Sequence, residues 1–441
     1  MNLPNNALKY LNKYSFSGWE VETNQTKLFN NAIVIPAISE FENIKNSLAS
    51  LSNNDRKYFN STIVLFVINN PVSADSDVKS DNLKSIEFLQ GIINKKNTDV
   101  LSSVIINSGI TIGLVDASTK GKELPDNIGG VGMARKIGMD LALSIFDYDS
   151  PAKKILICTD ADCTFEENYL SELVSNFNKK NQSAAVVNFK HDISGEGENT
   201  KAIICYEYYL RYYVFGLKYS GSPFAFHTIG STMSCDFESY IKVEGMNKRK
   251  AAEDFYFLEK LAKQFKVEKI CSTTVYPSDR GSWRVPFGTG QRVNRFLSKT
   301  QNEYLLYNPQ NFELLKKWNE AFYKNSDLIS YYLDSAETIH PEIHRFLIKQ
   351  EFDRAFSKIL NQSASEQQLN KQKKSWFNGF MTLKFIHHLR DTVNPNIDSF
   401  EAIDILIEKM GISCNIKREK GIIPELAIQK EYLELLRQID N

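Results

Sequence analysis

Two aspartates separated by one residue follow a short apolar run in the middle of the sequence. Ile155, Leu156 and Ile157 predict a buried strand, and Asp160 and Asp162 come shortly after it. Residues i and i+2 of an extended chain point to the same side, so we expect the two carboxylates to lie next to each other. Such oxygen ligands suit Mg²⁺ or Mn²⁺, and open α/β sheets bind ligands at the carboxyl ends of their strands. The same residues are also compatible with an acidic loop that caps the following helix.

The composition is that of an ordinary globular chain. Its 441 residues are 42% hydrophobic and 24% charged with a formal net charge of +0, which allows two domains and argues against a nonspecific nucleic-acid binder. The 6 scattered cysteines have no C-x-x-C spacing and predict neither a zinc site nor a disulfide framework. No signal peptide is expected, and the apolar runs are too short to span a bilayer. We therefore expect a cytoplasmic protein, with peripheral membrane contact left open.

Strands alternate with helices through the first part of the chain. Strands are predicted at 32–37, 62–68, 110–115, 155–159, 184–189 and 266–275, with helices between them. This alternation predicts βαβ units and a largely parallel sheet. Segment 75–97 predicts an exposed helix within an insertion, and segment 362–375 predicts a linker. The aromatic segment 203–219 predicts a helix that either packs in the core or offers a sugar-stacking or membrane-interface surface.

The order of these parts resembles the family 2 glycosyltransferases of the GT-A fold. The matching segments are IVIPAISE (33–40), VINNP (67–71), GGVGMARKIGMD (129–140), ICTDADC (157–163), TIGSTMSCDFESYIKVEGM (228–246) and AAEDF (251–255). The resemblance implies a Rossmann-like, mostly parallel sheet flanked by helices. The expected organisation is an N-terminal extension (1–27), a GT-A glycosyltransferase domain (28–300) and a helical C-terminal module (301–441). The Q-x-x-R-W motif of processive members is only approximated at 291–296, which favours a non-processive bacterial type.

The resemblance also implies roles for single residues. Asp160 and Asp162, on either side of Ala161, would hold Mn²⁺ or Mg²⁺ and the donor diphosphate, and Asp254 would be the general base. Helix N-capping is the alternative for the pair Glu253 and Asp254. The other residues expected to line the nucleotide-sugar pocket are Pro36, Ala37, Glu40, Asn69, Arg135, Lys136, Arg280 and Arg284.

Several of these assignments have a second interpretation. Asn69 stands where the family usually has an acidic residue that reads the base, so the donor stays open among UDP-, GDP- and dTDP-sugars. Arg280 and Arg284 suit diphosphate oxygens, but they also fit an ordinary surface loop. Glu253 and His227 are expected on the acceptor side; His227 could contact the acceptor or the metal, but a hydrogen-bonded cleft residue is the favoured interpretation for it.

The expected activity is metal-dependent, inverting transfer of a sugar from a nucleotide sugar to a hydroxyl of a glycan, lipid or small molecule. A sugar-phosphate nucleotidyltransferase is the first rival, but it should carry a Gly-rich basic loop where this chain has Ala37-Ile38-Ser39-Glu40. A non-catalytic sugar-nucleotide-binding scaffold is the second rival, and the intact set of three aspartates counts against it. The sequence leaves the sugar, the acceptor, the role of the C-terminal helices and the oligomeric state open.

Overall fold

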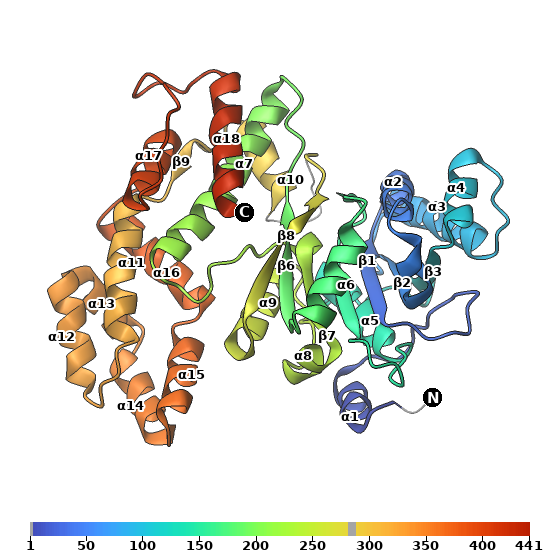
Figure 1. The fold of residues 1–441 in the computed structure, drawn as a ribbon, viewed down its shortest axis with the longest axis horizontal. Coiled ribbons are helices and arrows are strands. Elements are labelled where there is room, and N and C mark those ends of the chain that lie inside the picture. The colour runs from blue at the N-terminus through green and yellow to red at the C-terminus, as the bar shows by residue number, and fades with distance from the viewer. Residues whose placement is uncertain (1–2, 281–287) are drawn as a thin grey trace.

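The fold is that of a computed structural model, which describes residues 3–280 and 288–441. Within those ranges, one eight-stranded sheet forms the centre of the molecule (Figure 1). Its strands are β1 (Asn31–Ala37), β2 (Thr62–Asn69), β3 (Thr111–Ala117), β4 (Ile155–Cys158), β5 (Thr164–Phe165), β6 (Ala184–Phe189), β7 (Met233–Asp236) and β8 (Val267–Tyr276). They lie side by side in the order β3-β2-β1-β4-β7-β6-β8-β5.

The direction of the strands brings most carboxyl ends to one edge of the sheet. β1 pairs in parallel with β2 and β4, β2 with β3, and β6 with β8, whereas β7 is antiparallel to β4 and β6. The short β5 is antiparallel to β8. The expected α/β class with a mostly parallel sheet is therefore confirmed. Chain order reverses on the two sides of β1, and such a switch point is where open α/β sheets bind ligands.

Helices cover both faces of the sheet, which explains the uninterrupted apolar strands. In β1, Ile33 and Ile35 face one core, and Ala32 and Val34 face the other. The helices on the first side are α2 (Phe41–Ser52), α3 (Ser76–Ile93), α4 (Val100–Ser108) and α6 (Tyr169–Lys179). Those on the second side are α1 (Asn5–Tyr14), α5 (Val131–Leu143), α8 (Phe237–Lys242) and α9 (Glu253–Gln264).

Two segments differ from their sequence-based predictions. The helix expected at 75–97 is present as α3, but its expected exposure is wrong, because Ile86, Leu89 and Ile92 are buried against the sheet next to β3. The linker expected at 362–375 is also wrong, because helix α15 (Glu366–Trp376) occupies most of it. In both segments most residues are polar, so the few apolar residues that pack are hard to recognise in the sequence.

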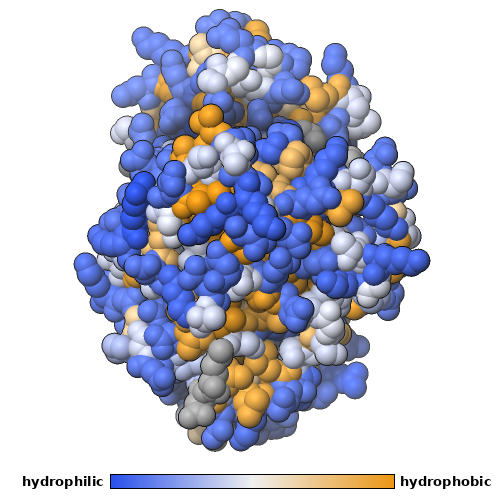
Figure 2. Space-filling view, turned by 90° about the vertical axis from the view of Figure 1, so that its right-hand side faces the viewer, coloured by the Kyte–Doolittle hydropathy of each residue, from blue (hydrophilic) through white to orange (hydrophobic). Residues whose placement is uncertain are grey.

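The outer face over α3 and α4 is mainly hydrophilic, with apolar side chains in separate patches (Figure 2). Leu83, Val100 and Val104 are among the exposed apolar residues of these two helices. Scattered exposure of this kind is normal for a globular protein and needs no partner to explain it.

A helical region packs beside the β6–β8 side of the sheet (Figure 1). Its helices are α7 (Glu198–Tyr219), α10 (Thr289–Leu297), α11 (Pro309–Phe322), α12 (Ile329–Ile339), α13 (Pro341–Lys349), α14 (Phe352–Gln362), α15, α16 (Gly379–Thr392), α17 (Ser399–Lys409) and α18 (Leu426–Asp440). Buried aromatic residues such as Trp318, Phe322 and Tyr332 form its core. Among the described helices, none has the length and apolar character of a membrane span.

The last helix is joined to the sheet by a buried cluster of charges. The Asp440 carboxylate lies 2.7 Å from His227 Nε2, 2.7 Å from Arg211 Nη1 and 2.8 Å from Lys269 Nζ. Burial acts to raise the pKa of Asp440, but His227, Lys269 and Arg211 together hold it well below its usual range. The cluster links α18 to α7, β8 and the segment before β7, so contacts cross the domain boundary proposed near residue 300. That boundary and the one near residue 28 stay predictions.

Replacing Asp440→Asn removes one negative charge from this cluster. Four cationic or polar partners, Arg211, His227, Lys218 and Lys269, would lose their carboxylate, and we expect a loss of about 3–5 kcal/mol in the free energy of unfolding. Urea unfolding of the full chain measures it. Glu431→Gln, an exposed change on the same helix, should leave stability within about 0.5 kcal/mol. Equal stability of the two variants would show that Asp440 does not hold α18 in place.

Candidate functional site

Side chains from four separated segments meet at the carboxyl edge of the sheet around the switch point. Glu40 follows β1, Asp160 and Asp162 follow β4, and Arg280 follows β8. Arg135 reaches the same edge from the first turns of α5. The edge therefore carries alternating acidic and basic groups, most of them partly exposed to solvent.

Arg135 is the buried centre of this group. Its side chain is 3% exposed, Nη1 donates to the Glu253 carboxylate, and Nη2 donates to the Asp160 carboxylate. A methyl group on Gly230 would overlap the Arg135 guanidinium, and one on Gly132 would overlap the backbone at Arg249. These two glycines permit the close approach that fixes the start of α9 next to the end of β4.

Burial also sets the charge of the two acids at the start of α9. Burial raises the pKa of Glu253 to about 7, although the Arg135 guanidinium acts in the opposite direction. The same two effects act on Asp254, and the net result is a pKa above its ordinary value. Asp254 is half-buried and accepts a 2.7 Å hydrogen bond from the backbone N–H of Phe255. A carboxylate with a raised pKa at a site edge is a good proton acceptor near neutral pH.

The second aspartate of the pair lies beside a different arginine. Arg280 Nη2 is 3.2 Å from Asp162 Oδ2, and the same nitrogen contacts the carboxylate of Glu40. Side-chain exposure is 37% for Asp160 and 22% for Asp162, so both are partly exposed to solvent. Arg284, expected in the same pocket, lies outside the described residues.

The oxygen ligands present fit a divalent ion that is shared with a substrate. In residues 3–280 and 288–441, no group of three or more His, Cys, Asp and Glu side chains gathers as a metal site. Mg²⁺ in phosphate-transfer sites usually takes only one or two protein carboxylates and fills its remaining positions with water and phosphate oxygens. The partly exposed pair Asp160 and Asp162 meets that requirement, and a bound ion would compete with the two arginines for them.

Asn69 ties together the ends of two strands at the edge where the nucleotide is expected. Its Nδ2 donates to the carbonyls of Ala37 at 3.0 Å and Val67 at 3.1 Å. Pro36 and Ala37 are buried within β1, and Pro36 lies opposite Val67. From α3, Asn82 accepts from Ser39 N–H at 2.8 Å and donates to the Asn69 carbonyl at 3.0 Å. The amides thus fix the loops after β1 and β2.

Two residues expected at the site have other neighbours. Lys136 Nζ is buried 2.9 Å from Asp140 Oδ2 and 3.0 Å from the Tyr10 hydroxyl, on the side of α5 that faces α1. Successive helix residues point about 100° apart, which separates Lys136 from Arg135. His227 contacts Asp440 of the last helix, and burial lowers its pKa despite that carboxylate. The structure therefore places both residues in fold-stabilising clusters and not with Asp160 and Asp162.

Several aromatic residues lie near Asp254, and only a general sequence signal indicates them. Burial raises the pKa of Tyr206 of α7 to about 12, and the Asp254 carboxylate acts in the same direction. The Phe255 and Tyr256 rings lie 6.5 Å and 6.0 Å from that of Phe380 in α16. Helical periodicity could identify the aromatic face of α7, but it could not place that face next to Asp254.

No protein-family model matches the sequence, and a comparison with curated proteins gives no match. Among solved structures, the chain is similar to S. aureus TarS 1-349 in complex with UDP-GlcNAc, at 11% identity and a TM-score of 0.37, covering 79% of this chain and 91% of that chain. It is also similar to the mannosyltransferase PcManGT from Pyrobaculum calidifontis in complex with GDP-Man and Mn²⁺, at 12% identity and a TM-score of 0.35, covering 88% and 95% of the two chains. Scores this low leave the function to be argued from the residues of this chain.

Replacing Arg135→Met tests the buried contact at the centre of the site. The change leaves the Glu253 carboxylate buried without its cation, and we expect a loss of about 3–5 kcal/mol in unfolding free energy near neutral pH. The loss should shrink at about pH 5, because Glu253, whose pKa is already raised, then binds a proton and no longer needs the cation. Urea unfolding at about pH 5 and about pH 8 compares the two conditions.

Glu253→Gln in the Arg135→Met background serves as the control. It should recover much of the lost stability near neutral pH, because the buried negative charge is gone. Additive effects of the two changes would show that these side chains do not interact.

Proposed function

We propose that this protein is a metal-dependent, inverting glycosyltransferase of the family 2 type that its sequence resembles. The observation that supports this most is the meeting of Asp160, Asp162 and Asp254 at the carboxyl edge of one sheet, connected through Arg135 and Glu253. The donor is a nucleotide sugar and the acceptor carries a hydroxyl group. The reaction needs a site for a diphosphate and a base for the acceptor proton, and these residues supply both.

The donor side is formed by the ends of β1, β2, β4 and β8. Asp160 and Asp162 would hold Mn²⁺ or Mg²⁺ together with the diphosphate, and the bound ion would neutralise charge on the leaving diphosphate as a Lewis acid. Arg280, which already lies at Asp162, can donate to phosphate oxygens in a bidentate manner. Glu40 and the strand ends held by Asn69 line the place for the nucleoside.

The acceptor side is formed by the start of α9 and the aromatic residues near it. As the acceptor oxygen bonds to the anomeric carbon, the bond from that carbon to the diphosphate oxygen breaks, and the acceptor proton passes to Asp254. Inversion of the anomeric centre requires that Asp254 and the diphosphate lie on opposite sides of the bound sugar. Phe380, which is exposed and lies next to Phe255, offers an apolar face on which an acceptor ring can stack.

Glu253 is a positioning residue in this proposal. It holds the Arg135 guanidinium, which in turn holds Asp160. It therefore acts through Arg135 and does not touch the reacting atoms. Glu253 is buried and its pKa is raised, which agrees with a contact to Arg135 and not with a contact to substrate.

Incubation with a panel of UDP-, GDP- and dTDP-sugars and Mn²⁺ tests the proposal directly. A transferase releases nucleoside diphosphate slowly from one donor even without acceptor, and that donor raises the thermal stability of the chain. Release of pyrophosphate from a nucleoside triphosphate would instead identify a nucleotidyltransferase. Binding of a donor with no release under any condition would identify a scaffold.

Asp162→Ala should remove metal-dependent donor binding. The change deletes one of the two carboxylates that a shared ion would use, and we expect donor affinity in Mn²⁺ to fall by at least about tenfold. Titration calorimetry with and without Mn²⁺ measures it. Asp149→Ala, an exposed aspartate before β4, is the matched control and should bind as the unaltered protein does. Unchanged affinity in Asp162→Ala would remove this residue from the donor site.

Asp254→Asn should keep donor binding and lose transfer. Loss of a general base typically costs about 10²–10⁴-fold in rate. Because the pKa of Asp254 is raised, kcat/KM of the unaltered protein should fall as pH drops through a value above that of an ordinary aspartate. The residual rate of Asp254→Asn should not show this fall in kcat/KM at low pH. If the variant keeps full activity and the same fall in kcat/KM at low pH, another residue is the general base.

A further inference from the structure

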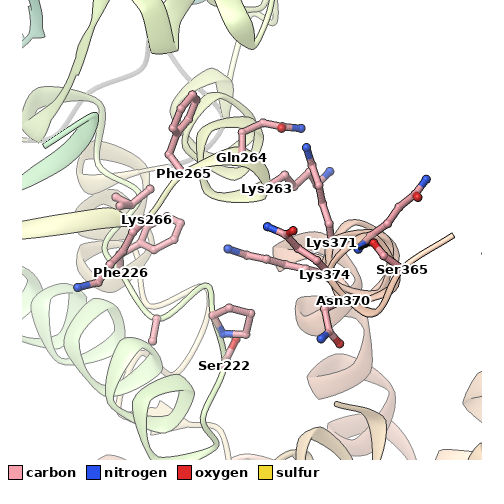
Figure 3. A pocket seen from close by; sticks show the side chains of 15 residues that line it. Ser222, Phe226, Lys263, Gln264, Phe265, Lys266, Ser365, Asn370, Lys371 and Lys374 are labelled. Carbon is pink, nitrogen blue, oxygen red and sulfur yellow. Dashed lines mark hydrogen bonds between the residues drawn. The ribbon is translucent and has the colours of Figure 1, made fainter. Parts of the chain in front are cut away.

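A cavity of about 880 Å³ lies between the C-terminal end of α9 and helix α15 (Figure 3). The end of α9 and the start of β8 form one wall, and one face of α15 forms the opposite wall. The loop after α7, from Ser222 to Phe226, lines a third side. The volume falls within the range of about 300–1,000 Å³ that is usual for ligand sites.

The charged residues that line this cavity are all lysines. They are Lys263 and Lys266 on the α9 side and Lys371 and Lys374 on α15, and the described lining contains no aspartate or glutamate. Figure 3 shows Lys374 reaching from α15 toward the opposite wall, whereas Lys266, whose side chain is 81% exposed, points away from α15. The remaining polar residues of the lining are uncharged, mainly glutamine, asparagine and serine. The cavity therefore offers positive charge and amide or hydroxyl donors.

The α15 lysines point into the cavity because of their helical spacing. Lys371 and Lys374 are one turn apart and share a face with the neutral donor Asn370 beside them. Lys373 points the opposite way into the helical core, where its Nζ donates to the carbonyl of Lys324 at 3.2 Å. The helix thus separates one structural lysine from two that face the cavity.

The two walls differ in how their charges are compensated. Lys263 has Glu259 as partner at 3.2 Å, and Lys266 has Glu268 at 2.9 Å. Within the described parts of the chain, the two α15 lysines form no ion pair. Burial also lowers the pKa of Lys374. An anion in the cavity would therefore be stabilised mainly by the two α15 lysines.

This cavity is distinct from the site around Asp160. Asp254 stands at the start of α9 and Gln264 at its end. A helix of that length spans about 18 Å at 1.5 Å per residue. The lysines therefore do not belong to the donor site, and a ligand here would bind at a separate place on the same helix.

We propose that this cavity binds an anionic ligand with several phosphate groups, held chiefly by Lys371 and Lys374. A phosphate group presents several acceptor oxygens and up to two charges, which suits a lining whose charged residues are all lysines. A single phosphate would leave most of the volume empty, so the ligand carries a chain of them or further groups between them. Both a soluble phosphate chain and clustered lipid headgroups have this chemistry.

Titration calorimetry of the full chain with inorganic tripolyphosphate tests the proposal. EDTA is present so that no divalent ion bridges the probe to Asp160 and Asp162. We expect binding that weakens about tenfold or more in the double variant Lys371→Gln and Lys374→Gln. The matched control is the double variant Lys349→Gln and Lys358→Gln, which removes the same charge from exposed positions of α13 and α14. It should bind as the unaltered protein does.

Sedimentation with phosphatidylglycerol vesicles distinguishes the two sources of phosphate. Vesicle binding that is lost only in the α15 double variant identifies a headgroup, and tripolyphosphate binding without vesicle binding identifies a soluble chain. Thermal unfolding should show all variants folded, since the changes remove exposed or mutually repelling charges. The proposal is overturned if neither probe binds, or if the α15 and control variants bind equally well.

Discussion

The site depends on one buried cation. A guanidinium removed from water is stable only when carboxylates and hydrogen bonds replace the lost hydration. Arg135 meets that requirement with Asp160 from the end of β4 and Glu253 from the start of α9. The need to neutralise this group therefore holds three distant parts of the chain together. It also places Asp254, the neighbour of Glu253, beside the aspartate pair.

The sheet provides the frame in which that contact acts. Parallel strands on both sides of β1 place polar residues at one edge, and amide contacts from Asn69 and Asn82 fix the loops that leave it. The helical region makes direct contacts with this sheet and its flanking helices. Asp440 anchors the last helix to β8, and the backbone N–H of Phe380 donates to Glu259 of α9 at 3.0 Å. Helices from the end of the chain thus complete the surface next to Asp254.

Helix α9 connects two regions of opposite character. Its N-terminal end carries Glu253 and Asp254, where the positive end of the helix dipole favours carboxylates. Its C-terminal end carries Lys263, where the negative end favours cations, and it faces the lysines of α15. With a formal net charge of +0 over the chain, these opposite local fields arise from placement and not from composition.

The sequence by itself determined six of the eight strands of the central sheet in the described part of the chain, most of the helices around them and the aspartates that follow β4, because those signals are local. Apolar runs and alternation place β1 and β6 within a residue, and Asp160 and Asp162 follow β4 as expected, although a turn at 161–162 replaces the extended chain predicted there. Only the tertiary structure decided that Arg135 binds Glu253, 118 residues away, and that His227 binds Asp440, 213 residues away. It also decided that α3 and α15 pack although most of their residues are polar. Contacts between distant segments depend on how whole helices and strands are oriented, and local sequence patterns do not specify that orientation.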